Sequence, residues 1–139
     1  MRKPSMKKRT SKLLQVILLT LIIGMMSATG AMAAKAGWNT ISGKTYYYVK
    51  SGTKLKKVTG LYKINGGYYY FDKSSGVMQK GWQKIDNAWY YFSAGGGMQT
   101  GWQKINNTWY YFRSGGAMVT GRQQIDGKWY TFSSGGALQ

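Results

Sequence analysis

The residues of this chain that could bind a ligand are mainly tryptophan and tyrosine. Trp82, Trp89 and Tyr91 lie within one stretch of ten residues, and the same residue types return twenty positions later. The second set is Trp102, Trp109 and Tyr111. Electron-rich ring faces attract a quaternary ammonium group such as choline by about 0.5–2 kcal/mol per ring. Because an indole can also stack on the apolar face of a sugar, the rings alone leave both ligand classes open.

Other kinds of site chemistry have few residues available. The chain contains no cysteine and no histidine, so it can form neither a disulfide nor a metal site built from these residues. Its only carboxylates are Asp72, Asp86 and Asp126, and each falls at or beside an expected turn. A paired-carboxylate hydrolase needs two such groups on either side of one bond. We therefore expect a protein that is not an enzyme, with no catalytic residue, no metal ligand and no cofactor.

The aromatic residues belong to a short internal repeat. Copies begin at glycines 37, 60, 81, 101 and 121, with spacings of 23, 21, 20 and 20 residues. Each copy has two apolar stretches around a two-residue turn sequence, and the turns are Ser42-Gly43, Asn65-Gly66, Asp86-Asn87, Asn106-Asn107 and Asp126-Gly127. Such pairs suit the type I′ turn of a β-hairpin. A period this short predicts an all-β solenoid of consecutive β-hairpins, joined by glycine-rich loops.

A two-residue turn also predicts the register of each hairpin. In the third copy Trp82 should lie opposite Tyr91, and Lys84 opposite Trp89, all on one face. The other face carries an isoleucine and two aromatic residues in every copy, here Ile85, Tyr90 and Phe92. We expect this uniform face to form the stacking core and the variable tryptophan face to bind ligand. Cross-strand aromatic pairs also stabilise sheets without any ligand, so packing alone is the alternative interpretation of the tryptophan face.

The N-terminal residues have the pattern of a secretory signal peptide. Six basic residues lie within residues 2–12, an apolar run covers residues 13–26, and Ala31-Met32-Ala33 supplies small residues for cleavage. This pattern predicts a helical signal peptide over residues 1–33 and a repeat domain over residues 34–139. A retained membrane anchor is the alternative, but the apolar run is shorter than the roughly 20 residues that a spanning helix needs.

The chain that remains after such cleavage is strongly basic. It keeps 14 of the 20 lysines and arginines and all 3 aspartates, which gives a formal charge of 14 − 3 = +11. This charge favours polyanionic surfaces, although scattered lysines can also serve solubility. We expect no nucleic acid as a partner, because a secreted chain meets phosphate-rich wall polymers more often. Lys84 and Lys104, on the tryptophan face, suit the phosphate of phosphocholine.

The third copy, GWQKIDNAWYYFSAGGGMQT, resembles the cell-wall-binding repeat, also called the choline-binding repeat. This repeat type is similar to the glucan-binding repeats of secreted glucosyltransferases and to the C-terminal repeats of large clostridial toxins. The GW, WYYF and G-x-M motifs stand at family spacing in the third and fourth copies, and the resemblance extends more loosely over residues 37–139. It implies a hairpin solenoid, usually a left-handed superhelix, that binds ligands between successive hairpins through aromatic residues and a methionine.

The resemblance implies two sites. One would combine Trp82, Trp89 and Tyr91 with Met98 and Trp102, and the other Trp102, Trp109 and Tyr111 with Met118. We expect one or two working sites, because Leu61 and Arg122 replace tryptophan in other copies.

The implied ligand is choline on teichoic or lipoteichoic acid, with a glucan or other surface carbohydrate as the alternative. We accordingly expect a secreted, cell-wall-associated protein. An end hairpin leaves an unpaired surface that allows a homodimer unless it is capped, and Arg122 and Thr131 in the last copy fit a polar cap.

Overall fold

The computed structural model of the chain describes residues 33–139. The predicted signal peptide lies outside the described residues, apart from Ala33. The chain divides into two units, Met1–Ala33 and Ala34–Gln139, and the second contains all the strands given below. No helix that could cross a membrane occurs in the part of the chain that the structure describes.

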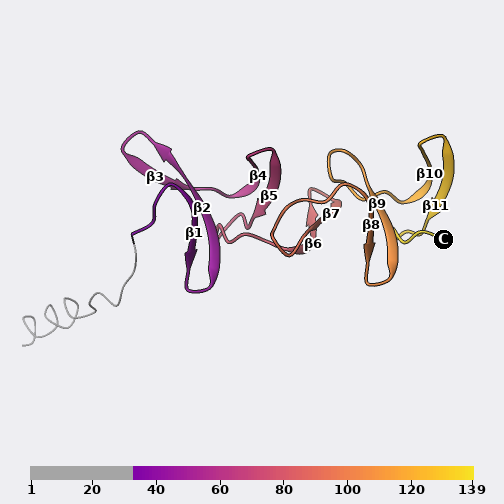
Figure 1. The fold of residues 1–139 in the computed structure, drawn as a ribbon, viewed down its shortest axis with the longest axis horizontal. Coiled ribbons are helices and arrows are strands. Elements are labelled where there is room, and N and C mark those ends of the chain that lie inside the picture. The colour runs from indigo at the N-terminus through magenta and orange to yellow at the C-terminus, as the bar shows by residue number, and fades with distance from the viewer. Residues whose placement is uncertain (1–32) are drawn as a thin grey trace, which may run out of the picture. The chain divides into compact units, whose positions relative to one another are not determined.

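The described residues form antiparallel β-hairpins that follow one another along the chain (Figure 1). The strands are β1 (Gly37–Ile41), β2 (Lys44–Ser51), β3 (Lys54–Lys57), β4 (Gly60–Ile64), β5 (Gly67–Phe71), β6 (Gly81–Ile85), β7 (Ala88–Phe92), β8 (Gly101–Ile105), β9 (Thr108–Phe112), β10 (Gly121–Ile125) and β11 (Lys128–Phe132). β4–β5, β6–β7, β8–β9 and β10–β11 are two-stranded sheets, whereas β1, β2 and β3 form one three-stranded sheet. The predicted all-β solenoid of hairpins is confirmed.

The hairpin turns have the backbone that their residues favour. Asp86 and Asn87 have φ angles of 47° and 66°, and each of the other hairpin turns likewise has two residues with positive φ. Positive φ at both central positions defines the type I′ turn, which asparagine, aspartate and glycine tolerate best. The predicted register is also confirmed, because Trp82 pairs with Tyr91 and Lys84 pairs with Trp89.

The uniform face forms the core, as predicted, in the second to fifth repeats. Phe71, Phe92 and Phe112 have no exposed surface, and the isoleucines of these repeats are at most 8% exposed. The first repeat differs from the prediction, because Ile41 is 38% exposed. Among the described residues no hairpin precedes β1, so none covers this face of the first sheet.

The tryptophan face is also part of the packing, which was the alternative interpretation of this face. The ring of Trp82 lies 4.9 Å from that of Tyr110 and 5.6 Å from that of Phe112, both in the following hairpin. Trp102 makes the same contact with Tyr130 at 4.8 Å. The tryptophan face of one hairpin therefore packs on the uniform face of the next, and the two faces do not have separate roles.

Strand β3 was not predicted. In the first repeat β2 continues to Ser51, the chain turns at Gly52 with a φ of 63°, and β3 pairs with β2. This pairing replaces the glycine-rich loop of the later repeats. Every residue of β3 is exposed and three of its four residues are lysine. Because no alternation of apolar and polar residues marks such a strand, hydrophobic periodicity does not reveal it.

Candidate functional site

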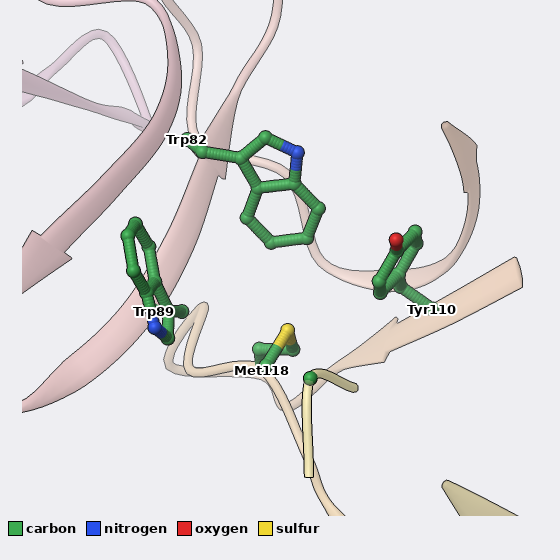
Figure 2. A pocket seen from close by; sticks show the side chains of 5 residues that line it. Trp82, Trp89, Tyr110 and Met118 are labelled. Atoms are coloured by element: carbon green, nitrogen blue, oxygen red, sulfur yellow. The ribbon is translucent and has the colours of Figure 1, made fainter. Parts of the chain in front are cut away.

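One pocket of about 410 Å³ lies between consecutive repeats and is lined by Trp82, Trp89, Tyr110, Met118 and Gly135. Figure 2 shows the four larger side chains around a common space. We call the set Trp82, Trp89, Tyr110 and Met118 the aromatic cage. Its volume is within the range of pockets that hold small molecules or single groups of a polymer.

Hairpin β6–β7 supplies the two indole walls of the cage. Trp82 in β6 and Trp89 in β7 lie on the same face but in neighbouring cross-strand pairs, so they meet diagonally. Their ring centroids are 6.3 Å apart and their planes are nearly perpendicular, at 86°. Trp82 is half-buried by the next hairpin, whereas Trp89 is 42% exposed. The two rings therefore form a corner that is open to a ligand from solvent.

The following repeats supply the other walls. Tyr110 lies in β9, and Met118 lies in the loop that follows β9. The backbone N–H of Met118 donates a hydrogen bond of 2.8 Å to the carbonyl oxygen of Trp89, which holds the methionine beside the indole. Gly136 has a φ of 84°, and a side chain there would collide with the Met118 sulfur. Residues from three successive repeats therefore determine the shape of one pocket.

No charged side chain lines the cage. Asp72, a carboxylate that accepts hydrogen bonds from Ser74 and Ser75, lies outside the cage in the loop after β5. The backbone N–H and hydroxyl of Ser75, with further bonds from Ser74, hold the pKa of the Asp72 carboxyl well below its usual range. Asp72 thus stabilises a turn, as expected. The cage offers ring faces and a methionine sulfur, which suit a cation without hydrogen-bond donors.

The structure divides the sequence-predicted site residues differently from the expected grouping. Trp82, Trp89 and Met118 line one pocket, while the Tyr91 ring packs behind, 5.2 Å from the ring of Trp82. Met98 lies instead in a pocket of about 380 Å³ lined by Leu61, Tyr68, Met98, Ser114 and Gly115. Its N–H donates to the carbonyl oxygen of Tyr68 at 2.8 Å. The loop after one hairpin contacts the hairpin before that one. The methionine of a cage therefore comes from one repeat later in the chain than the expected grouping placed it.

Sequence reasoning missed Tyr110 as a cage residue because it assigned this tyrosine to the core. The position is tyrosine in every repeat, as Tyr46, Tyr69, Tyr90, Tyr110 and Tyr130. All five are only half-buried, whereas the phenylalanine two residues further on in the second to fifth repeats is at most 2% exposed. A polar-tipped ring at a position that could hold phenylalanine was the available signal, since tyrosine favours places where one end of the ring is wet.

Trp102, Trp109 and Tyr111 repeat the geometry of the third hairpin in β8–β9. The two indole centroids are 6.4 Å apart at 86°, and Tyr111 packs 5.1 Å from Trp102. Tyr130 takes the place of Tyr110, but Leu138 takes the place of Met118, and its N–H donates to the Trp109 carbonyl oxygen at 2.9 Å. This second group of residues therefore has the rings of the cage without its methionine.

The remaining repeats each lack part of the set. Thr45 stands where the third repeat has Trp89, and Leu61 stands where it has Trp82. In the last repeat the Arg122 guanidinium lies 4.4 Å from the ring centre of Trp129 and covers that indole with a cation of the chain itself. Within residues 33–139 the complete set of two tryptophans, a tyrosine and a methionine therefore occurs once.

The fold and the cage define a class of protein: a β-hairpin repeat module with aromatic pockets between its repeats. The chain belongs to the choline-binding repeat family, since a model of that repeat matches residues 58–100 and 99–138. A second model, for a cell wall binding repeat, matches residues 36–52. A search of curated proteins finds no significant match.

Several solved structures from Streptococcus pneumoniae are similar. CbpJ from strain TIGR4 is 42% identical, with a TM-score of 0.71 over 76% of this chain and 35% of that one. Choline binding protein F is 40% identical, with a TM-score of 0.70 over 76% of this chain and 35% of that one. The same protein in the presence of a peptidoglycan analogue gives 42% identity, a TM-score of 0.70, and coverage of 76% and 34%. This chain therefore spans about a third of the length of these relatives.

Proposed function

We propose that the aromatic cage binds the choline groups of a bacterial cell-wall polymer and that the protein acts as a secreted wall-attachment module. The observation that supports this most directly is the perpendicular pair Trp82 and Trp89, completed by Tyr110 and Met118 in a pocket without charged side chains. A trimethylammonium group presents methyl surface on every side and needs no hydrogen-bond acceptor. Ring faces and a thioether are therefore sufficient partners for it.

The expected affinity for free choline is modest. Three rings at about 1–2 kcal/mol each give about 3–6 kcal/mol, which corresponds to dissociation constants between several millimolar and tens of micromolar. Such affinity is weak for one group but adequate for attachment to a polymer that carries many copies, because rebinding raises the effective concentration. Teichoic or lipoteichoic acid carrying choline is the polymer we propose. The basic charge of the domain suits its phosphates.

The test is a choline titration of residues 34–139 followed by tryptophan fluorescence at physiological salt. The decisive variant is Trp89→Ala, because Trp89 is exposed and its removal should leave the core intact. Trp129→Ala is the matched control, since that indole is 57% exposed and lies outside the cage. A saturable choline response that Trp89→Ala loses and Trp129→Ala keeps would support the proposal.

A parallel titration with a soluble glucan separates the alternatives. A flat choline response with a saturable glucan response would replace choline by a carbohydrate as the ligand of the cage. Silence toward both ligands would mean that the tryptophan face serves packing alone, as cross-strand aromatic pairs can without a ligand.

A further inference from the structure

The N-terminal part of the described residues carries an uneven share of the positive charge. Residues 33–71 contain seven lysines and no carboxylate, whereas residues 72–139 contain seven basic residues and three aspartates. The ion pair found in the described part of the chain, Lys73 with Asp86 at 3.6 Å, involves none of these seven lysines. Residues 33–71 therefore have a net charge of +7 that no ion pair among the described residues offsets.

Strand β3 concentrates this charge at the edge of the first sheet. The sheet order is β1-β2-β3, so β3 lies at the edge (Figure 1). All four of its residues are exposed. Lys54 and Lys56 pair with Ser51 and Val49 of β2 and project from the same face, about 7 Å apart along the strand. Two ammonium groups at this spacing present a row of positive charge to an extended anionic chain.

A groove of about 170 Å³ lies beside this row and adds hydrogen-bonding groups. It is lined by Val49, Lys56, Lys57, Val58, Thr59 and Tyr62. Lys57 is already held in place, since its Nζ donates to the carbonyl oxygen of Ser75 at 3.1 Å and lies 4.9 Å from the ring centre of Tyr46. Thr59 and Tyr62 contribute hydroxyl groups. Ammonium groups with hydroxyl donors are the usual partners of phosphate oxygens, with lysine acting as a point charge.

We propose that Lys54, Lys56 and this groove, together the lysine surface, bind the phosphodiester backbone of an anionic wall polymer independently of choline. Charge complementarity selects this partner, because the surface combines lysines with hydroxyls and includes no carboxylate. The lysine surface shares no lining residue with the aromatic cage. The protein would thus hold one kind of polymer through two chemistries, with rings for its substituents and lysines for its backbone.

The competing explanation is that the lysines only protect an edge strand from pairing with other chains, as lysines on edge strands commonly do. The two explanations differ in what happens when the lysines are neutralised. Protection predicts unchanged polymer binding and more aggregation. Phosphate recognition predicts weaker binding with a smaller dependence on salt.

The experiment uses choline-free poly(glycerol phosphate) as the probe and residues 34–139 as the protein, titrated at 50 and 200 mM salt. Each phosphate contact on a flexible single chain contributes about −0.7 to the slope of log K against log salt, by analogy with single-stranded nucleic acid. For Lys54→Gln with Lys56→Gln we expect a slope smaller by about 1.4. The affinity loss between the two salts should correspondingly be about 7-fold smaller than in the wild type.

The matched control is Lys80→Gln with Lys128→Gln, which removes the same charge from exposed positions outside the lysine surface. We expect the control to keep wild-type polymer binding, also in saturating choline. Thr59→Val should weaken binding without changing the salt slope. All variants alter exposed side chains, and unchanged thermal unfolding would show that they fold.

Three results would overturn the inference. The control variant could lose as much binding as the lysine-surface variant, which would mean that only net charge matters. Choline could displace the choline-free polymer, which would assign binding to the cage. Single-stranded DNA or anionic phosphatidylglycerol vesicles could bind more tightly than the polymer at equal salt. Because the probe carries no choline, a failure here leaves the proposed function of the aromatic cage unaffected.

Discussion

Gly136→Ala tests how the structure couples the loops to the cage. Gly136 has a φ of 84°, where a residue with a side chain costs about 1–2 kcal/mol. A Cβ at this position would also collide with the Met118 side chain, with its Cγ at 3.0 Å and its sulfur closer still. Met118 lines the cage, so it must move away for the alanine to fit. One methyl group should therefore affect both stability and ligand binding.

Gly127→Ala separates the two causes. Gly127 has a similar φ of 78°, but a Cβ there would have no neighbour within 4 Å. We expect this control to cost only the backbone term, about 1–2 kcal/mol. Gly136→Ala should cost the same amount plus about 1–3 kcal/mol for overpacking, or about 2–5 kcal/mol in total. Choline affinity should fall in Gly136→Ala and remain unchanged in Gly127→Ala.

The assay combines urea unfolding, followed by tryptophan fluorescence, with choline titration of the folded proteins. Met118→Ala in the Gly136→Ala background should recover stability, because the smaller side chain removes the collision. Equal stability losses in Gly136→Ala and Gly127→Ala, together with equal choline affinities, would refute the inferred contact between the loop and the cage.

Two further predictions address the corrected grouping and the role of Asp72. Tyr110→Ala should weaken choline binding about 5- to 30-fold, because it removes one ring worth about 1–2 kcal/mol. Tyr90→Ala is the control, at the same position one repeat earlier and outside the cage, and it should change choline binding less than about 2-fold. Similar losses of affinity for the two variants in a fluorescence titration would contradict the assignment of Tyr110 to the cage. Asp72→Asn should destabilise the domain at neutral pH, because a carboxyl with a depressed pKa contributes stability above its unfolded pKa of about 3.9. The difference in free energy of unfolding between wild type and variant should shrink as the pH falls below about 4 toward the lowered pKa. Urea unfolding at pH 7 and at pH 3 measures this difference. A difference that does not depend on pH would rule out the carboxylate as its source.

Much of the fold follows from local patterns in the sequence. Asp86 and Asn87 favour the positive φ that a type I′ turn needs, and that turn sets the pairing of Trp82 with Tyr91. Side chains alternate along each strand, so the register assigns every residue to a face. These properties depend on a few neighbouring residues, and they repeat with the period of the sequence. Strand β3 escaped prediction because its exposed lysines carry no hydrophobic signal.

The composition of the pocket depended on contacts between repeats. Patterns within single hairpins predicted the hairpins, their turns, the buried Ile85 and Phe92, and the choice of Trp82 and Trp89 as ligand-binding candidates. The position of Met118 beside them is a property of the folded chain, because its N–H donates a hydrogen bond to the Trp89 carbonyl oxygen, 29 positions away (118 − 89). Such a contact depends on how each hairpin is rotated against the next, and that rotation comes from packing between side chains of different repeats. Turn preferences and strand alternation do not contain this information, because they act within a single hairpin.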